Sequence, residues 1–150
     1  MAGGEQKNMV LLAHFLAEGI NPLFVLLLLI APFLGPRPAF PRIVTFWGLT
    51  VLGIALAVVL AEEGKRHIVW AGHPGFPSGH ETFALACATS LVCWRGTWIW
   101  LVLPLAVVLG WALVAAHYHE TADVWGALLT GPAPALLCQA ARLRRKKPSS

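Results

Sequence analysis

The sequence predicts an all-α fold, a polytopic membrane helical bundle of about five transmembrane spans. Hydrophobic residues make up 57% of the 150 residues and charged residues only 12%, whereas soluble domains usually carry about 25% charged residues. The charged residues gather between long apolar runs, which is typical of helices that have lipid as their solvent. The length suits one membrane domain, residues 1–150.

Five apolar segments carry this prediction. They run over about residues 9–34, 43–61, 80–94, 97–117 and 122–141. The first is interrupted at Asn21-Pro22, where Asn21 could cap a new helix. It is therefore either a short interfacial helix followed by a short span or one kinked span. The last is interrupted by Gly131, Pro132 and Pro134, and such breaks are tolerated where neighbouring helices satisfy the backbone.

The basic residues predict the orientation of the bundle. With five spans, one side holds most of the Lys and Arg residues, namely Arg37, Arg42, Arg95, Arg142, Arg144, Arg145, Lys146 and Lys147. The positive-inside rule makes this side cytoplasmic. We expect an integral membrane protein of the bacterial inner (plasma) membrane, with a cytoplasmic tail, about residues 142–150, that binds anionic lipid heads. Because the basic residues flank apolar segments, no nucleic-acid partner is expected.

Two predicted outer loops carry the chemistry. The first ends in Pro77-Ser78-Gly79-His80, where Ser78 is a plausible N-cap and Gly79 permits close approach to a ligand. A helix start of this kind binds phosphate readily. The second loop holds His119 and Asp123 at i, i+4 spacing, so the carboxylate can orient the imidazole as a base or nucleophile. This combination suits phosphoryl transfer.

These motifs resemble the type 2 phosphatidic acid phosphatase family, which is related to vanadium-dependent haloperoxidases. The resemblance covers about residues 60–130. The family's second motif, Pro-Ser-Gly-His, is unchanged here, and the His and Asp of its third motif match His119 and Asp123. Its first motif, Lys-x6-Arg-Pro, is similar to Arg66-x6-His73-Pro74. Where the third motif begins with Ser-Arg, this chain has Ala112-Leu113.

The resemblance implies an enzyme that hydrolyses a lipid phosphate monoester or diphosphate at the extracytoplasmic face. His119 would attack phosphorus and form a phosphohistidine, Asp123 would orient it, and His80 would protonate the leaving group. The phosphate would be bound by Arg66, His73, Ser78 and Gly79. The family needs no metal or other cofactor. Because leucine cannot replace the arginine's bidentate grip on phosphate, turnover is the weak point of the expectation.

Two alternatives stay open. One is a catalytically weakened accessory or lipid-binding subunit that keeps the phosphatase fold. The other is a metal-binding membrane protein that uses His117, His119 and Asp123. Glu62, Glu63 and Glu81 are expected to be solvated helix ends.

Overall fold

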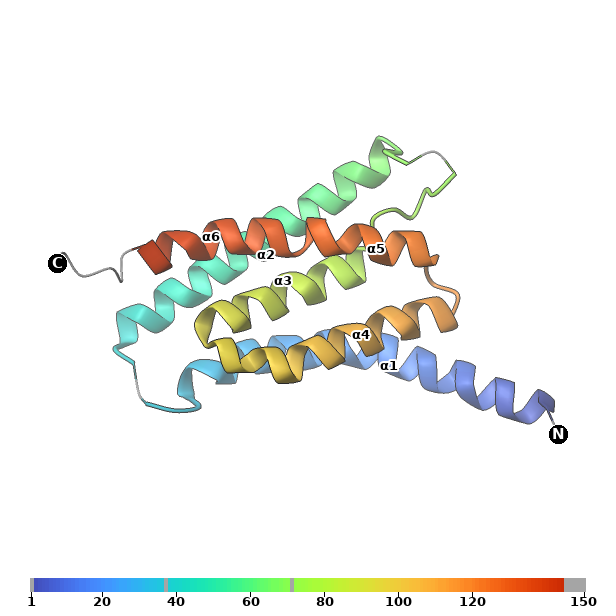
Figure 1. Cartoon of the computed structure of the whole chain (residues 1–150), viewed down its shortest axis with the longest axis horizontal. Coiled ribbons are helices and arrows are strands. Elements are labelled where there is room, and N and C mark those ends of the chain that lie inside the picture. The colour runs from blue at the N-terminus through green and yellow to red at the C-terminus, as the bar shows by residue number, and fades with distance from the viewer. Residues whose placement is uncertain (1, 37, 71, 145–150) are drawn as a thin grey trace.

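The computed structural model describes residues 2–36, 38–70 and 72–144, and within these ranges every regular element is helical (Figure 1). The elements are α1 (Ala2–Ile30), η1 (Ala31–Phe33), α2 (Phe40–Arg66), α3 (Gly79–Trp94), η2 (Gly96–Trp98), α4 (Ile99–Ala115), α5 (Thr121–Thr130) and α6 (Pro132–Arg144). The all-α prediction is confirmed. The basic tail beyond Arg144 lies outside the described residues.

Four segments in the described part of the chain are long and apolar enough to cross a membrane. They are Gly4–Phe33, Phe40–Arg66, Gly96–Ala115 and Thr121–Arg142. The fifth predicted segment forms α3, which has 16 residues. At 1.5 Å per residue α3 is about 24 Å long, somewhat less than the ~30 Å of a hydrocarbon core. The protein is therefore a membrane bundle of four full-length spans around one shorter helix.

Helix α3 is the central element of the bundle. It contacts α1, α2, α4, α5 and α6, and Figure 1 shows it between the α2 and α6 pair and the α1 and α4 pair. Its buried residues are mostly small, with Ala84, Ala86 and Cys87 fully enclosed. Small side chains let helix backbones approach closely, which favours packing where lipid supplies no hydrophobic driving force. The sequence thus gives the central helix a mostly small buried face.

Helix α1 is continuous through Pro22, so the first apolar segment is one span rather than an interfacial helix followed by a short span. Its buried face follows helical periodicity, with Ala13, Ala17, Ile20 and Phe24 turned inward. Asn21 caps no helix. Its side-chain amide instead donates to the backbone carbonyl of His80, with 3.4 Å between the two heavy atoms. This contact ties α1 to the start of α3.

The last predicted segment is divided into α5 and α6 at Gly131. A Cβ at Gly131 would lie only 2.7 Å from the carbonyl oxygen of Thr82 and 2.8 Å from Cβ of Leu85. The glycine therefore allows the junction to lie directly against α3. The hydroxyl groups of Thr82 and Thr130 are 2.8 Å apart at the same place, so the interrupted helix is still held to the centre of the bundle.

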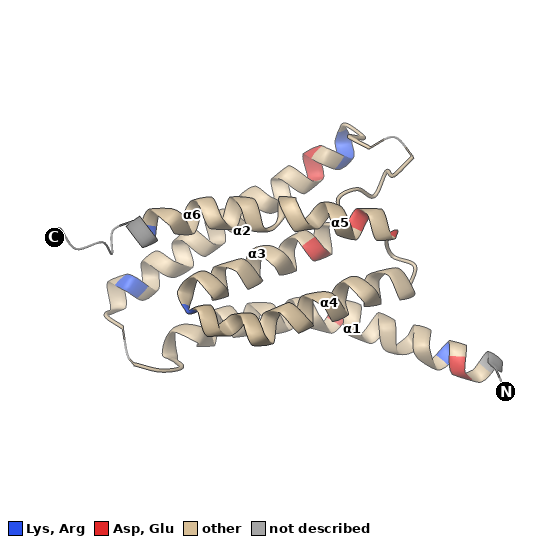
Figure 2. Cartoon of the chain, in the orientation of Figure 1, with Lys and Arg blue, Asp and Glu red and all other residues tan. Residues whose placement is uncertain are grey.

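The helices run between two ends of the bundle that differ in charge. Described acidic residues occur toward the end where α2 finishes and α3 and α5 begin, whereas Arg42, Arg95 and Arg142 lie toward the other end (Figure 2). The loops 67–78 and 116–120 both belong to the acidic end. The two loops that carry the sequence motifs therefore share one mouth of the bundle.

Candidate functional site

The His119 and Asp123 side chains form a largely buried pair at this mouth. Nδ1 of His119 lies 3.3 Å from Oδ2 of Asp123, and the two side chains are 13% and 6% exposed. His119 lies in the loop before α5 rather than on the helix, but the predicted pairing still forms. Oδ2 also accepts the backbone N–H of Glu120 at 3.1 Å, within a capping box that starts α5. Asp123 is thus fixed by backbone and directs Nε2 of His119 away from itself.

Gly75 and Ser78 lock the first loop onto this pair. A Cβ at Gly75 would lie 2.8 Å from Oδ2 of Asp123 and 3.5 Å from Nδ1 of His119. The backbone N–H of Ser78 donates to the carbonyl oxygen of Asp123 at 2.8 Å. Sequence reasoning missed Gly75, and the only available signal was a glycine between two prolines in a loop that carries the chemistry.

Ser78 is the N-cap of α3, as its place in the motif predicts. It is fully buried, and its Oγ accepts the backbone N–H of Glu81 at 3.4 Å. His80 in the first turn faces His119, and the two ring centroids are 6.1 Å apart with an interplanar angle of 62°. The start of α3 and the His119 loop therefore present two imidazoles beside the positive end of a helix dipole.

Electrostatics at the mouth act on His80 and on Tyr118. Partial desolvation lowers the pKa of His80 from its ordinary value, and the electrostatic influence of the neighbouring His119 and Lys65 lowers it further. His80 precedes the long apolar part of α3 and lies outside the four full-length spans. Desolvation and the negative charge of Glu18 raise the pKa of the Tyr118 phenol. Tyr118 therefore remains a protonated hydrogen-bond donor.

The cation that lies beside the Ser78-Gly79-His80 turn is Lys65 rather than Arg66. A Cβ at Gly79 would lie 3.2 Å from Nζ of Lys65, which pairs with Glu62 at 2.7 Å. Arg66 pairs with Glu63 at 3.0 Å, and its side chain is 73% exposed. Because α2 continues as a helix to Arg66, neighbouring residues point about 100° apart. The structure therefore does not bring Arg66 to the Ser78-Gly79 turn.

His73, the other predicted phosphate ligand, pairs with Glu120. Nδ1 of His73 lies 2.8 Å from Oε2 of Glu120, and the ring packs edge-on against Trp70 at 5.0 Å between centroids. The contact joins the same two loops that Gly75 and Ser78 join. His73 is thus close to the site but already paired with a carboxylate.

A cavity of about 410 Å³ opens beside His80, on the side of α1. Its lining includes Glu18, Asn21, Tyr118 and the fully buried Leu113, which stands where the resembled family has arginine. The Tyr118 hydroxyl is 2.9 Å from Nδ1 of His14 and donates to Glu18 at 3.4 Å. The cavity can hold a small polar group, and its described lining contains no lysine or arginine.

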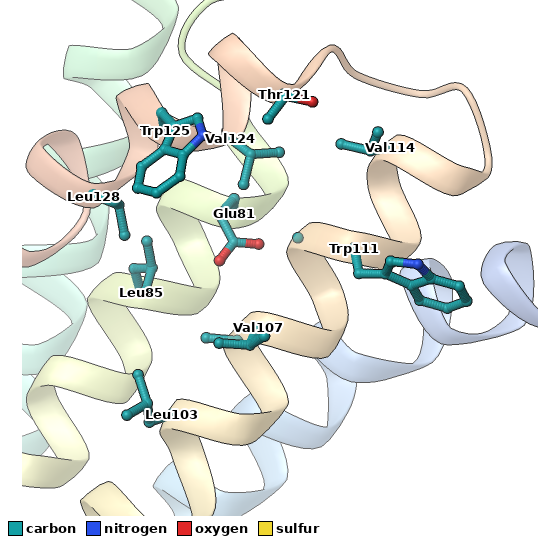
Figure 3. Close-up of a pocket in the computed structure, with 12 residues that line it drawn as sticks. Glu81, Leu85, Leu103, Val107, Trp111, Val114, Thr121, Val124, Trp125 and Leu128 are labelled. Atoms are coloured by element: carbon teal, nitrogen blue, oxygen red, sulfur yellow. The ribbon is translucent and has the colours of Figure 1, made fainter.

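A second, apolar crevice of about 450 Å³ lies between α4 and α5, with α3 as its floor (Figure 3). Glu81 was expected to be solvated, and that expectation is wrong: its side chain is buried in this lining. Within the described structure Oε2 of Glu81 is enclosed and has no hydrogen-bond partner. Figure 3 shows the carboxyl between Val124, Leu85 and Val107. The first turn of α3 thus faces both a polar cavity and an apolar crevice.

The metal-binding alternative needs at least three converging ligands. In the part of the chain that the structure describes, no three His, Cys, Asp or Glu side chains are grouped closely enough to hold one metal ion. His117 is exposed and has a backbone φ of 60°. The histidine–aspartate pair therefore stands without a third ligand.

Comparison of the chain with protein-family models, with curated proteins and with solved structures finds no match.

Proposed function

We propose that this protein is a membrane hydrolase that removes phosphate from a lipid phosphate monoester or diphosphate, in the manner of the type 2 phosphatidic acid phosphatase family. The observation that carries the proposal is the meeting of two sequence motifs at one mouth of the bundle. The His119 and Asp123 pair lies against the Ser78-Gly79-His80 turn, with 6.1 Å between the two imidazole centroids. Motif spacing alone does not require that contact.

In the proposed first step, Nε2 of His119 attacks phosphorus and a P–N bond forms while the bond to the lipid oxygen breaks. Oδ2 of Asp123 accepts a hydrogen bond from Nδ1–H of His119, which fixes the tautomer in which Nε2 is unprotonated and nucleophilic. Protonated His80 transfers its proton to the departing lipid oxygen. In the second step water attacks the phosphohistidine, the P–N bond breaks, and neutral His80 accepts a proton from the water.

The negative charge that develops on the phosphoryl oxygens must be stabilised by hydrogen-bond donors. The free N–H groups at the start of α3 and the Gly79 backbone supply them in this proposal, together with Lys65. Lys65 would have to exchange Glu62 for phosphate, which a flexible ammonium group can do. His73 could exchange Glu120 in the same way. Among the predicted phosphate ligands, Arg66 has the least support, because its side chain points outward.

A lipid substrate is supported by the surroundings of the site. The apolar crevice beside Glu81 runs along α4 and starts at Thr121, two residues from His119. A hydrocarbon chain in the crevice would leave a phosphate head at the mouth, at the membrane interface. Phosphatidate, phosphatidylglycerophosphate, polyprenyl diphosphate and a lipid A phosphate are the candidate substrates. The orientation proposed from the basic residues makes the mouth extracytoplasmic, in a bacterial inner membrane.

Phosphate release by the purified full-length protein tests this proposal. We expect release from at least one lipid phosphate in the presence of EDTA, and loss of release in His119→Ala and in His80→Ala. His67→Ala is the matched control, because His67 is 76% exposed and pairs with Glu63. Release that survives both site substitutions would overturn the mechanism.

The accessory-subunit alternative is favoured by one specific observation. Leu113 is fully buried at the position of the family's arginine, and no described lysine or arginine takes its place in the cavity. Losing one such donor can cost ~10²–10³ in rate. Lipid-phosphate binding that is unchanged in His119→Ala, without release by any form of the protein, would support this alternative.

A further inference from the structure

The opposite end of the bundle holds a buried arginine whose own partners are all neutral. Arg142 in α6 is 6% exposed. Its Nε donates to Oε1 of Gln139 at 3.1 Å, and its Nη2 donates to the carbonyl oxygen of Cys93 at 2.7 Å. Gln139 is itself fixed, because its amide donates to Thr50 at 3.0 Å. Among the described residues, the enclosed Nη1 has no hydrogen-bond partner.

Aromatic rings hold this guanidinium in place. Cζ of Arg142 lies 5.0 Å from the ring centroid of Trp94 and 5.5 Å from that of Phe46. Arg42 lies over the same Trp94 ring at 5.1 Å. Cation–π contacts stabilise a cation, but they do not neutralise it. Two guanidiniums that share one indole leave this end of the bundle positively charged.

No carboxylate side chain of the protein is available to neutralise them. The acidic residues are Glu5, Glu18, Glu62, Glu63, Glu81, Glu120 and Asp123. They lie in α1 as far as its middle, near the end of α2, and at the beginnings of α3 and α5, all toward the other end of the bundle (Figure 2). A buried charge without a counterion is costly, so an anion bound beside Arg142 would be stabilised.

The two arginines line one cavity of about 320 Å³ between the start of α2 and the end of α6. Helix α2 begins there without a side-chain cap and without an acidic residue in its first turn, so its positive dipole end is uncompensated. The remaining lining is formed by Thr45 and by the apolar residues Pro41, Leu49 and Ala141. A cavity with cationic and apolar walls at the ends of two membrane spans suits a headgroup with its chains still in the bilayer.

We propose that the Arg42 and Arg142 cavity binds the phosphate of an anionic membrane lipid, at the face of the bundle opposite the histidine site. Arginine suits this role because its planar fork can offer two donors to one phosphate. Nη1 of Arg142, which has no partner among the described residues, becomes a donor to the phosphate when the guanidinium turns toward the cavity that it lines. The site is independent of the proposed hydrolase function, since it uses neither histidine loop.

Native mass spectrometry of the full-length protein in detergent tests this site. Phosphatidylglycerol is the anionic probe, phosphatidylcholine of the same chains the zwitterionic one, and inorganic phosphate the free anion. We expect phosphatidylglycerol to bind with the highest affinity and to raise Tm by mass action. Because hydrogen bonds to charged groups contribute about 1.5–3 kcal/mol, Arg142→Gln should weaken binding at least about tenfold.

Two further variants keep the test decisive. Arg42→Gln changes an exposed residue, so it reports on the site even if Arg142→Gln does not fold. Arg95→Gln is the matched control, because Arg95 is an exposed arginine at the same end of the bundle. The affinity of this variant for phosphatidylglycerol should differ from that of the wild type by less than about twofold. Equal phosphatidylglycerol affinity in the Arg42, Arg95 and wild-type proteins would overturn the proposal. Equal binding of phosphatidylcholine, or competition by inorganic phosphate at equal concentration, would overturn the lipid assignment.

Discussion

Replacing Glu81 by leucine is expected to stabilise the protein. Glu81 is 3% exposed, and its Oε2 is enclosed by the crevice without a hydrogen-bond partner in the described structure. The carboxyl lies against Gly110, where a Cβ would be 3.6 Å from Oε2. The other neighbours in the lining are apolar, including Leu85 and Val107. A leucine has a similar size and would meet these neighbours with carbon atoms.

The expected gain follows from the cost of that unpaired oxygen. A buried polar group without a partner costs about 1–3 kcal/mol, and leucine removes this cost without leaving a cavity. For a chain of this length, 1 kcal/mol shifts Tm by about 2–4 °C. Glu81→Leu should therefore raise Tm by roughly 2–12 °C.

Thermal unfolding of the purified protein in one detergent measures this shift. Glu81→Gln is the matched control, because the amide keeps the size and the polarity and should give a much smaller gain. A lower Tm for Glu81→Leu than for the wild type would refute the reasoning, since it would mean that the carboxyl makes a stabilising interaction.

Three further predictions concern the mouth and the crevice. Gly75→Ala should lower kcat/KM about 10²-fold, because its Cβ would displace the Asp123 carboxylate; a change below twofold in lipid phosphate release would contradict the geometry. Val107→Trp fills the crevice and should reduce release from long-chain but not from short-chain lipid phosphates, whereas Val108→Trp, outside the lining, should change neither. The alkaline limb of the pH profile of kcat/KM should lie below the ordinary histidine value of 6.5, because protonated His80 is the acid and its pKa is lowered; a limb above 6.5 would count against that role.

The fold class could be predicted because it depends on composition and on apolar periodicity. The ends of the helices could not be predicted. Charged residues mark where a membrane span can end, whereas a helix ends where its backbone hydrogen bonding stops. Helix α2 continues through Glu62 to Arg66, past the predicted end at residue 61. That continuation separates Lys65 from Arg66 by about 100° around the helix, and it selects Lys65 as the cation beside Gly79.

The histidine–aspartate pair could be predicted from its spacing because its geometry is local. Contacts between segments that are far apart in the sequence could not be predicted. Nothing in the spacing shows that Asn21 of α1 reaches the carbonyl of His80, or that Gly75 packs on Asp123. Charge alone also misled for Glu81, because a glutamate next to a loop is usually solvated, and only the packing of α4 and α5 encloses this one.

A phosphoenzyme measurement tests the central proposal most directly. The full-length protein would be mixed with a ³²P-labelled lipid phosphate, quenched with alkali and analysed by peptide mass spectrometry. The proposal predicts a label that is stable in alkali and labile in acid, located on His119, and absent from His119→Ala while His67→Ala keeps it. Phosphate release without any labelled histidine, or a label that persists in His119→Ala, would contradict the phosphohistidine mechanism.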